Sequence, residues 1–336
     1  MFIRRVIYLI CLFALACKRP SPAISFYYWK TTYQQTKADS QVLADNEVKD
    51  LYLRYFDLDV SGAEKQPTLL APVCFAQSPD SNLNIVPVVY IKNNVFIQAT
   101  DSSIPALAAH TIEAIQSISK TAAVRYREIQ IDCDWTRQSR DRYFHFLREL
   151  KQQSGVPLSA TIRLHQVKYP AQSGIPPVDR GLLMYYNMGY IADVPENSIY
   201  DEKTAKKYSA SIPGYPLPMD LALPVFSWGI QIRNGKVVHL LNKMNASDLA
   251  DKNQFIPESE NRFRVKQAGF RSGYYFQEND VIKIEQVSPR DLKDIAENIR
   301  PNPRRPFSKV LFYDLDEANY TRYEKTIFKD IAAALR

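Results

Sequence analysis

Eight short apolar runs, each long enough for one buried β-strand, are the feature of this 336-residue sequence that most restricts its fold. Segments of helical length separate most of them, a pattern that is typical of parallel βαβ units. Eight such units close into a barrel, so the sequence predicts an α/β protein with a (β/α)8 TIM-type barrel. The expected strands are Ala23–Trp29, Leu51–Val60, Ile85–Phe96, Glu128–Trp135, Leu158–His165, Gly181–Met188, Asp220–Trp228 and Val310–Asp316.

Amphipathic helices are expected between these strands. Residues 141–150 place four apolar side chains on one helix face, and Gly155 follows as a stop signal. Residues 103–119 form a second amphipathic pattern. Ser288 begins a Ser-Pro-Arg-Asp sequence that is typical of a capped helix start, so a third helix is expected over 292–299.

Two segments depart from this alternation. Residues 166–179 contain three prolines and a glycine, which predicts an ordered loop instead of a crossover helix. Residues 230–287 contain alternating, strand-like stretches with little helical periodicity. We expect a β-rich insertion after the seventh strand, inside a single barrel domain over residues 23–336; a separate small β-domain is the alternative.

The N-terminus has the layout of a secretion signal. Arg4 and Arg5 precede eleven apolar residues, 6–16, which are too few to cross a bilayer core that needs about 20. The Ala-Leu-Ala-Cys sequence that ends at Cys17 resembles the lipobox of bacterial lipoproteins. This resemblance implies cleavage after residue 16, lipidation of Cys17, a tether over 17–22 and anchoring in the cell envelope, to the outer membrane. The alternative is an ordinary cleaved signal with an incidental cysteine.

Composition excludes several classes of protein. A 46% hydrophobic fraction indicates a globular chain with a large core. The net charge of +7 is spread along the chain without a basic tract, so no nucleic-acid partner is expected. There is no phosphate-binding glycine loop and no Cys/His metal spacing, so neither a cofactor nor a metal is expected. Cys74 and Cys133 lie in apolar runs and are expected to be two buried thiols instead of a disulfide.

Polar residues collect where the expected strands end, which is the end of a (β/α)8 barrel that carries active sites. Strand alternation places Gln130, Asp132 and Asp134 on one face of the fourth strand and the apolar Ile131 and Cys133 on the other. Two carboxylates so close together repel, which raises the pKa of one of them. The candidate residues at the strand ends are Arg54, Asp57, Asp59, Asp132, Asp134, Arg163, His165, Tyr185, Asn187, Asp314 and Asp316.

All three tryptophans, Trp29, Trp135 and Trp228, also fall at the ends of expected strands. Sugar rings have apolar faces that stack on aromatic side chains, while carboxylates and amides bind the surrounding hydroxyls. Together with Tyr185 and Asn187, these residues favour an oligosaccharide or polysaccharide ligand. The competing interpretation is that the tryptophans are core residues and the charges a structural layer.

The sequence Asp132-Cys133-Asp134-Trp135-Thr136 resembles the fourth strand of chitinase-type glycoside hydrolases, which ends Asp-x-Asp-x-Glu. The two aspartates match, but Thr136 stands where that family has its proton-donating glutamate, so the family mechanism does not transfer intact. The strings Ile-Gln-Ile-Asp-Cys-Asp-Trp-Thr and Leu-Pro-Val-Phe-Ser-Trp-Gly more closely resemble uncharacterised bacterial barrel lipoproteins. That second resemblance covers most of the chain and implies the barrel and the lipid anchor, not a reaction.

Two functional hypotheses follow. The first is a glycoside hydrolase whose carboxyl pair is drawn from Asp132, Asp134, Asp57 and Asp314, with Asp134 as the acid and Asp132 adjusting its pKa. The second is a glycan-binding lipoprotein without catalysis, and a structural or assembly role in the envelope is a third possibility. In either glycan hypothesis the expected substrate-binding residues are Trp29, Arg54, Asp59, Trp135, Arg163, His165, Tyr185, Asn187, Trp228 and Asp316.

Overall fold

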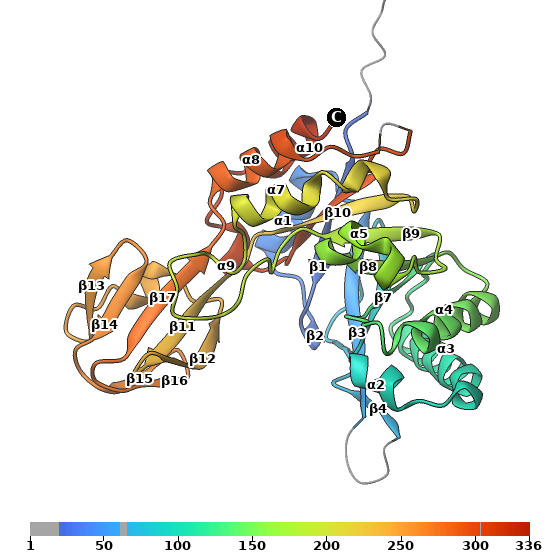
Figure 1. The fold of residues 1–336 in the computed structure, drawn as a ribbon, viewed down its shortest axis with the longest axis horizontal. Helices are drawn as coiled ribbons and strands as arrows, with labels where there is room; N and C mark the ends of the chain where they lie inside the picture. Colours follow the sequence, from blue (N-terminus) through green and yellow to red (C-terminus); the bar gives the residue numbers. More distant parts are fainter. Residues whose placement is uncertain (1–19, 61–65, 303) are drawn as a thin grey trace, which may run out of the picture.

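The computed structural model describes residues 20–60, 66–302 and 304–336. Eight parallel strands form a closed barrel, in which β1 pairs with β18 on one side and with β3 on the other (Figure 1). The predicted (β/α)8 fold is therefore confirmed, and each of the eight expected runs supplies one strand. The strands are β1 (Ala23–Tyr28), β3 (Asp50–Val60), β6 (Asn84–Ile91), β7 (Ile129–Asp132), β8 (Leu158–Arg163), β9 (Arg180–Met184), β10 (Met219–Pro224) and β18 (Lys309–Tyr313).

Helices cover the outside of the barrel, and the predicted capping signals mark where several of them begin. Ser288 caps α8 through a reciprocal capping box with Asp291, and Gly155 ends α4 in the left-handed conformation. Thr36 and Asp39 form the same kind of box on α1. The longer helices are α1 (Lys37–Asp45), α3 (Ile104–Thr121), α4 (Arg140–Ser154), α7 (Glu202–Ser209), α8 (Pro289–Asn298) and α10 (Ile327–Ala334). Shorter helices are α2 (Asn93–Gln98) and α9 (Glu317–Tyr320).

Two local predictions need correction. The connection between β8 and β9 is not an ordered loop throughout, because α5 (Leu164–Lys168) and α6 (Pro170–Ser173) occupy its first part. Pro170 stands at the start of α6, where its missing N–H costs nothing, so the proline shortens the helices without preventing them. Cys74 is exposed, not buried, because the strand β5 (Cys74–Phe75) lies on the surface beside β2 (Thr32–Tyr33). Cys133 is buried as expected, and burial raises the pKa of its thiol well above the ordinary value.

The N-terminal ends of the barrel strands are joined by a partly buried charge cluster. Lys309 Nζ lies 2.8 Å from Asp50 and 3.6 Å from Glu128, and donates a hydrogen bond to the Tyr52 hydroxyl. Asp220 accepts backbone hydrogen bonds from Ser308 and Lys309. Because these groups satisfy one another, this end of the barrel is closed by structural polar contacts.

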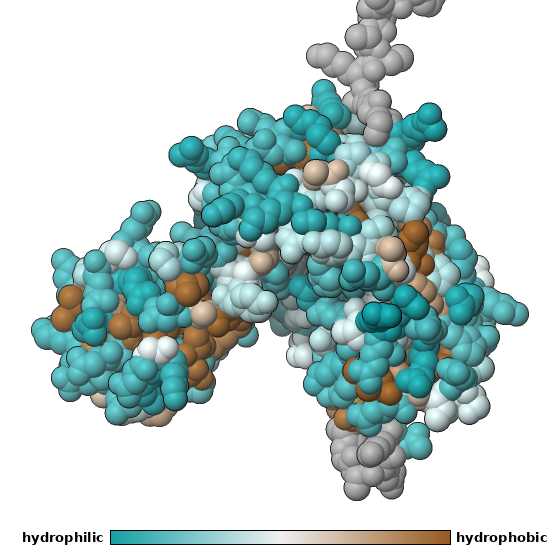
Figure 2. Space-filling view, viewed as in Figure 1, coloured by the Kyte–Doolittle hydropathy of each residue, from teal (hydrophilic) through white to brown (hydrophobic). Residues whose placement is uncertain are grey.

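Residues between β10 and β18 form a five-stranded antiparallel sheet beside the barrel (Figure 1). It has its own apolar cluster, which includes Phe255, Phe276 and Ile282. Figure 2 shows apolar side chains on this sheet and a recess between it and the barrel, on the side where the barrel strands end. The sheet strands are β11 (Ser227–Arg233), β12 (Lys236–Asn242), β13 (Phe255–Ser259), β14 (Arg262–Val265) and β17 (Val281–Gln286). A hairpin of β15 (Gly269–Arg271) and β16 (Tyr274–Phe276) accompanies them, and β4 (Pro67–Leu70) pairs antiparallel with the end of β3.

The predicted signal segment and Cys17 lie outside the described residues. In the part of the chain that the structure describes, no helix combines the length and the apolar character that a membrane span requires.

Candidate functional site

A cavity of about 420 Å³ lies at the C-terminal mouth of the barrel, between the barrel strands and the antiparallel sheet. Side chains from the ends of β1, β7, β9, β10 and β18 line it, and the first two strands of the sheet complete its wall. The lining residues are Trp29, Asp132, Met184, Tyr186, Asn187, Phe226, Ser227, Trp228, Asn242, Lys243, Tyr313 and Asp314. The mouth thus combines two carboxyl groups with an aromatic wall, as expected of a site for a polar ligand with apolar faces.

Asp132 is the last residue of β7 and points into the barrel. Its neighbour on the same strand face, Gln130, accepts a hydrogen bond from the Tyr27 hydroxyl across the interior. Asp132 Oδ1 accepts a hydrogen bond of 2.7 Å from the Thr161 hydroxyl on the adjacent strand. Burial raises the pKa of Asp132 to about 6; the Thr161 hydrogen bond opposes the increase, and the charge of Asp134 adds to it.

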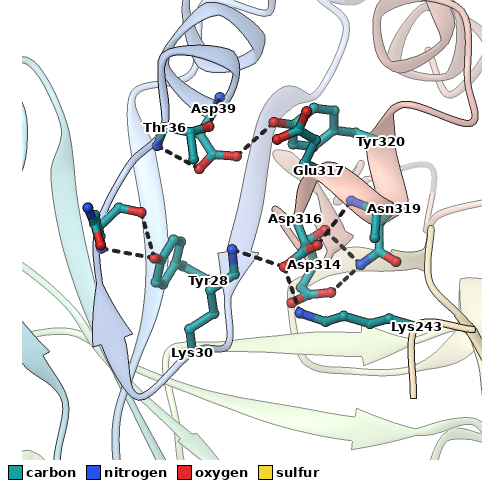
Figure 3. A network of polar contacts seen from close by, with 12 residues as sticks. Tyr28, Lys30, Thr36, Asp39, Lys243, Asp314, Asp316, Glu317, Asn319 and Tyr320 are labelled. Atoms are coloured by element: carbon teal, nitrogen blue, oxygen red, sulfur yellow. Dashed lines mark hydrogen bonds and ion pairs between the residues drawn. The ribbon is translucent and has the colours of Figure 1, made fainter. Parts of the chain in front are cut away.

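Asp314 follows β18 and is buried on the opposite side of the same cavity. Its Oδ1 accepts a hydrogen bond from the Asn319 side chain, as Figure 3 shows. Burial raises the pKa of Asp314 to about 6, while the positive charge of Lys243 opposes the increase. Two carboxyl groups with a pKa near 6 therefore line one cavity.

The neighbouring Asp316 has a different environment. It lies 2.9 Å from Lys30 Nζ and 2.6 Å from Lys243 Nζ (Figure 3). Its side chain also caps α9 by accepting a hydrogen bond from the Ala318 N–H. These contacts outweigh burial and lower the pKa of Asp316 below its ordinary value. Asp316 is therefore an ionised structural anchor beside the cavity that holds Lys243 at its rim.

The remaining candidate carboxylates on the second and fourth strands are also ion-paired. Asp134 binds Arg163 through two hydrogen bonds of 2.5 and 2.6 Å. Both oxygens of Asp134 are engaged in this bidentate pair, and Asp134 does not line the cavity, so the geometry does not support the prediction that it is the acid. The sequence also predicted that Asp132 would adjust the pKa of Asp134. In the structure, the charge of Asp134 instead adds to the increase that burial causes in the pKa of Asp132.

Asp57 and Asp59 do not line the cavity. Asp57 pairs with Arg54 at 2.7 Å, the salt bridge that their spacing allows, and Arg54 also donates to the Ala71 carbonyl. Asp59 pairs with Lys92 and accepts a hydrogen bond from Asn94. Both carboxylates therefore stabilise the end of β3. The structure does not bring them together with the candidate residues that line the cavity.

An aromatic wall surrounds the two buried carboxyl groups. The rings of Trp29 and Tyr313 lie 5.5 Å apart, and those of Phe226 and Trp228 lie 5.2 Å apart. Tyr186 packs between Phe226 and Tyr313, and its buried hydroxyl has no hydrogen-bond partner among the described residues. A buried hydroxyl without a partner is costly.

Two of the predicted substrate-binding residues, Trp135 and Tyr185, face away from the cavity. Trp135 is 3% exposed, donates its indole N–H to the Ser173 carbonyl and stacks on Tyr143 of α4. The expectation that all three tryptophans meet the ligand is therefore wrong for Trp135, which belongs to the core between β7 and α4. Tyr185 is likewise buried toward the helix layer, 6.5 Å from the Tyr200 ring.

His165 is exposed in α5, beyond the end of β8, and does not line the cavity. Partial burial and the Arg163 charge lower its pKa. Thr136 stands at the start of the turn into α4, where its backbone N–H donates to Ser139 Oγ at 3.0 Å and Asn93 Nδ2 donates to its hydroxyl. A threonine hydroxyl cannot donate a proton as a carboxylic acid does, so position 136 has no acid role in this chain.

Seven of the twelve cavity residues are absent from the sequence-based list of site residues: Met184, Tyr186, Phe226, Ser227, Asn242, Lys243 and Tyr313. Tyr186 has the same strand-end position in the sequence as its neighbour Tyr185, and only the backbone beyond β9 decides which of the two lines the cavity. Phe226 and Tyr313 carry the strand-end signal that identified the tryptophans. Lys243 directly follows β12 and carries no sequence signal. Among the described residues, no group of three or more His, Cys, Asp or Glu side chains could hold a metal ion.

Comparisons with known proteins support the fold. No protein-family model matches the sequence, and no curated protein sequence matches it either. Solved structures do match: the class V chitinase from Pseudomonas fluorescens Pf-5 has a TM-score of 0.54 at 12% identity, over 94% of this chain and 100% of that chain. The spore cortex-lytic enzyme SleL of Bacillus cereus has a TM-score of 0.53 at 14% identity, over 94% of this chain and 74% of that chain. The chain therefore has a (β/α)8 barrel with distant structural similarity to those of chitinase-type hydrolases.

Proposed function

We propose that this protein is a glycoside hydrolase of the cell envelope in which Asp132 and Asp314 are the catalytic carboxyl pair. The observation that carries the proposal is a contrast among the six candidate carboxyl groups. Four of them are ion-paired, whereas Asp132 and Asp314 have no ion-pair partner among the described residues, are buried and line the same aromatic cavity. Desolvated carboxyl groups of this kind are costly for folding, which favours a functional reason for them.

Their surroundings suggest how the two roles divide. Asp132 has one oxygen bonded to Thr161, and its other oxygen can hold a proton near neutral pH because burial raises the pKa to about 6. Asp314 lies near Lys243 and Lys30, whose positive charges favour its ionised form. In this mechanism Asp132 protonates the leaving glycosidic oxygen as the C–O bond breaks. Asp314 either deprotonates a water molecule that attacks the anomeric carbon, or attacks that carbon itself. In the second case a glycosyl ester forms, and water hydrolyses it after the now ionised Asp132 takes a proton from that water.

The aromatic wall supports a glycan as the ligand. Trp29, Trp228 and Tyr313 line the cavity with aromatic rings for stacking, while Lys243 at its rim can donate hydrogen bonds to sugar hydroxyl groups. The folds that this barrel resembles belong to a chitinase and a spore cortex-lytic enzyme, which makes chitin oligosaccharides and peptidoglycan fragments suitable first probes.

A glycan-binding protein without catalysis is the second candidate, and Thr136 is the observation that favours it. The residue that matches the family's proton-donating glutamate cannot supply a proton, and Asp134 is held by Arg163. Both candidates predict saturable binding at the cavity, but only the hydrolase releases product.

One experiment separates the two functions. The chain from residue 18 onward is incubated with the two probe classes, and binding and reducing-end release are followed for wild type, Asp132→Asn and Asp314→Asn. Product from wild type that is lost in both variants, with binding retained, supports the hydrolase. Binding without product in all three proteins supports the non-catalytic candidate, and absence of both would contradict a glycan function at this cavity.

We also propose that Cys17 carries a lipid that anchors the protein to the outer membrane. Residues 18–22 span at most about 18 Å, so the barrel would lie close to the lipid surface. Because all eight barrel strands are parallel and β1 starts at Ala23, the mouth lies at the end of the barrel opposite to the tether. The cavity would then open away from the anchoring membrane, toward polymers of the envelope. Mass spectrometry of the mature N-terminus tests this, and Cys17→Ser should release the protein from membranes.

A further inference from the structure

A buried carboxylate in the antiparallel sheet, Glu285, connects Trp228 in the cavity wall to Ser198 in the segment after β9. Its Oε2 accepts a hydrogen bond of 2.9 Å from the indole N–H of Trp228, which stands opposite it on the paired strand β11. The same oxygen accepts hydrogen bonds from the backbone N–H and the hydroxyl of Ser198. Trp228 belongs to the sheet, whereas Ser198 belongs to the connection between β9 and α7, so one carboxylate joins two separate segments.

Lys283 completes this contact from the same face of β17. Its Nζ lies 2.6 Å from Glu285 Oε1 and donates hydrogen bonds of 2.6 Å to the carbonyl oxygens of Val194 and Glu196. Both charged side chains are no more than 2% exposed. A buried ion pair is costly to desolvate and contributes little net stability, so its complete set of directed hydrogen bonds points to a role in fixing geometry.

The segment after β9 also links Glu285 and its partners to the cavity. Asn187 lines the cavity in the left-handed conformation, with φ at 55°, and its N–H donates 2.8 Å to the Ile199 carbonyl. Gly189 N–H donates to the Ser198 carbonyl at 3.1 Å. The segment that starts at Asn187 is therefore held against residues 198–199, and these are held by Glu285.

We propose that Glu285 is a positioning residue of the site, which fixes the Trp228 ring and the 187–201 loop in one arrangement before a ligand enters. The assignment of this arrangement to glycan binding rests on the proposed function, but the positioning itself does not. Glu285 touches neither the cavity nor the carboxyl pair, and acts through Trp228 and Ser198.

Asp280 offers a matched control in the same sheet. It is also a buried carboxylate, bonded to Arg233 at 2.7 and 2.8 Å and to the Gln231 side chain, but it lies at the other end of β11 and β17 and away from the cavity. Asp280→Asn therefore perturbs the sheet by the same type of substitution without touching Trp228 or the loop.

The test compares Glu285→Gln, Ser198→Ala and Asp280→Asn in the full-length chain, without ligand. Trp228 emission is isolated by subtracting the spectrum of the Trp228→Phe form of each protein, and hydrogen exchange is followed over residues 187–201. We expect Glu285→Gln to increase acrylamide quenching of Trp228 roughly threefold and to speed exchange of the loop roughly tenfold, because local opening becomes easier. Ser198→Ala should give a smaller change in the same direction, and Asp280→Asn should leave both signals unchanged.

Two results would overturn the proposal. One is unchanged Trp228 quenching and loop exchange in Glu285→Gln; the other is an equal change in Asp280→Asn, which would mean general loosening of the sheet. Because neither readout needs a ligand, the inference can fail or succeed independently of the glycan function. Where a chitin oligosaccharide or peptidoglycan fragment is bound, Glu285→Gln should also weaken its binding roughly tenfold.

Discussion

Replacing Asp132 by Asn should stabilise the folded protein at neutral and higher pH. Asparagine keeps the shape of the side chain and can still accept the Thr161 hydrogen bond, but it removes a charge that is buried in the barrel mouth. The pKa of Asp132 is about 6 in the folded protein against an ordinary value of 3.8. The folded state therefore holds the proton more tightly than the unfolded state, so wild-type stability falls as pH rises from 3.8 to 6 and then levels off.

The size of this effect follows from the two pKa values. A difference of about 2.2 pH units at 1.36 kcal/mol per unit gives about 3 kcal/mol. Relative to wild type, Asp132→Asn should have nearly the same stability at pH 4 and be about 3 kcal/mol more stable at pH 8. Urea unfolding of both proteins at the two pH values measures the difference.

Asp280→Asn supplies the control of opposite sign. Hydrogen bonds from Arg233, the Gln277 N–H and Gln231 outweigh burial and lower the pKa of Asp280. Its charge stabilises the fold above the ordinary pKa, so this variant should lose stability relative to wild type as pH rises. If Asp132→Asn gained no stability between pH 4 and pH 8, or followed the same trend as Asp280→Asn, the account of Asp132 as a desolvated carboxyl group without an ion-pair partner would be refuted.

Three further predictions concern the site. Asp314→Asn should lower glycan turnover roughly a hundredfold or more with binding retained, because general acid–base groups contribute about 10²–10⁴-fold; a smaller loss in a turnover assay would remove Asp314 from the pair. Turnover should fall as pH rises above about 6, because the proton on Asp132 is then lost. A flat pH–rate profile between pH 5 and 8 would contradict this assignment. Trp29→Ala should weaken glycan binding, as measured by ligand titration, without a large loss of stability. Trp135→Ala should instead lower the free energy of unfolding by about 3–5 kcal/mol, as measured by urea unfolding, because Trp135 is a core residue. Equal stability losses in the two variants would contradict these placements.

Much of the fold could be predicted because its signals are local. Apolar runs of strand length, the Ser288 capping box and the glycine after α4 depend on residues a few positions apart, and each corresponds to an observed element. The correspondence failed where local chemistry allowed two outcomes. Proline shortened the helices after β8 without excluding them, and an apolar run around Cys74 became a surface strand.

For the site, the sequence by itself determined that carboxylates and aromatic rings collect at the strand ends, since strand alternation places Gln130 and Asp132 inside the barrel. Only the tertiary structure decided which carboxylates are free to react. Asp134 and Asp316 are neutralised by Arg163 and Lys243, residues 29 and 73 positions away in the chain, while Asp132 and Asp314 are desolvated without a partner cation among the described residues. Desolvation and ion pairing depend on what surrounds a group in space, so the acid that the local motif favours and the acids that the fold leaves available are different residues.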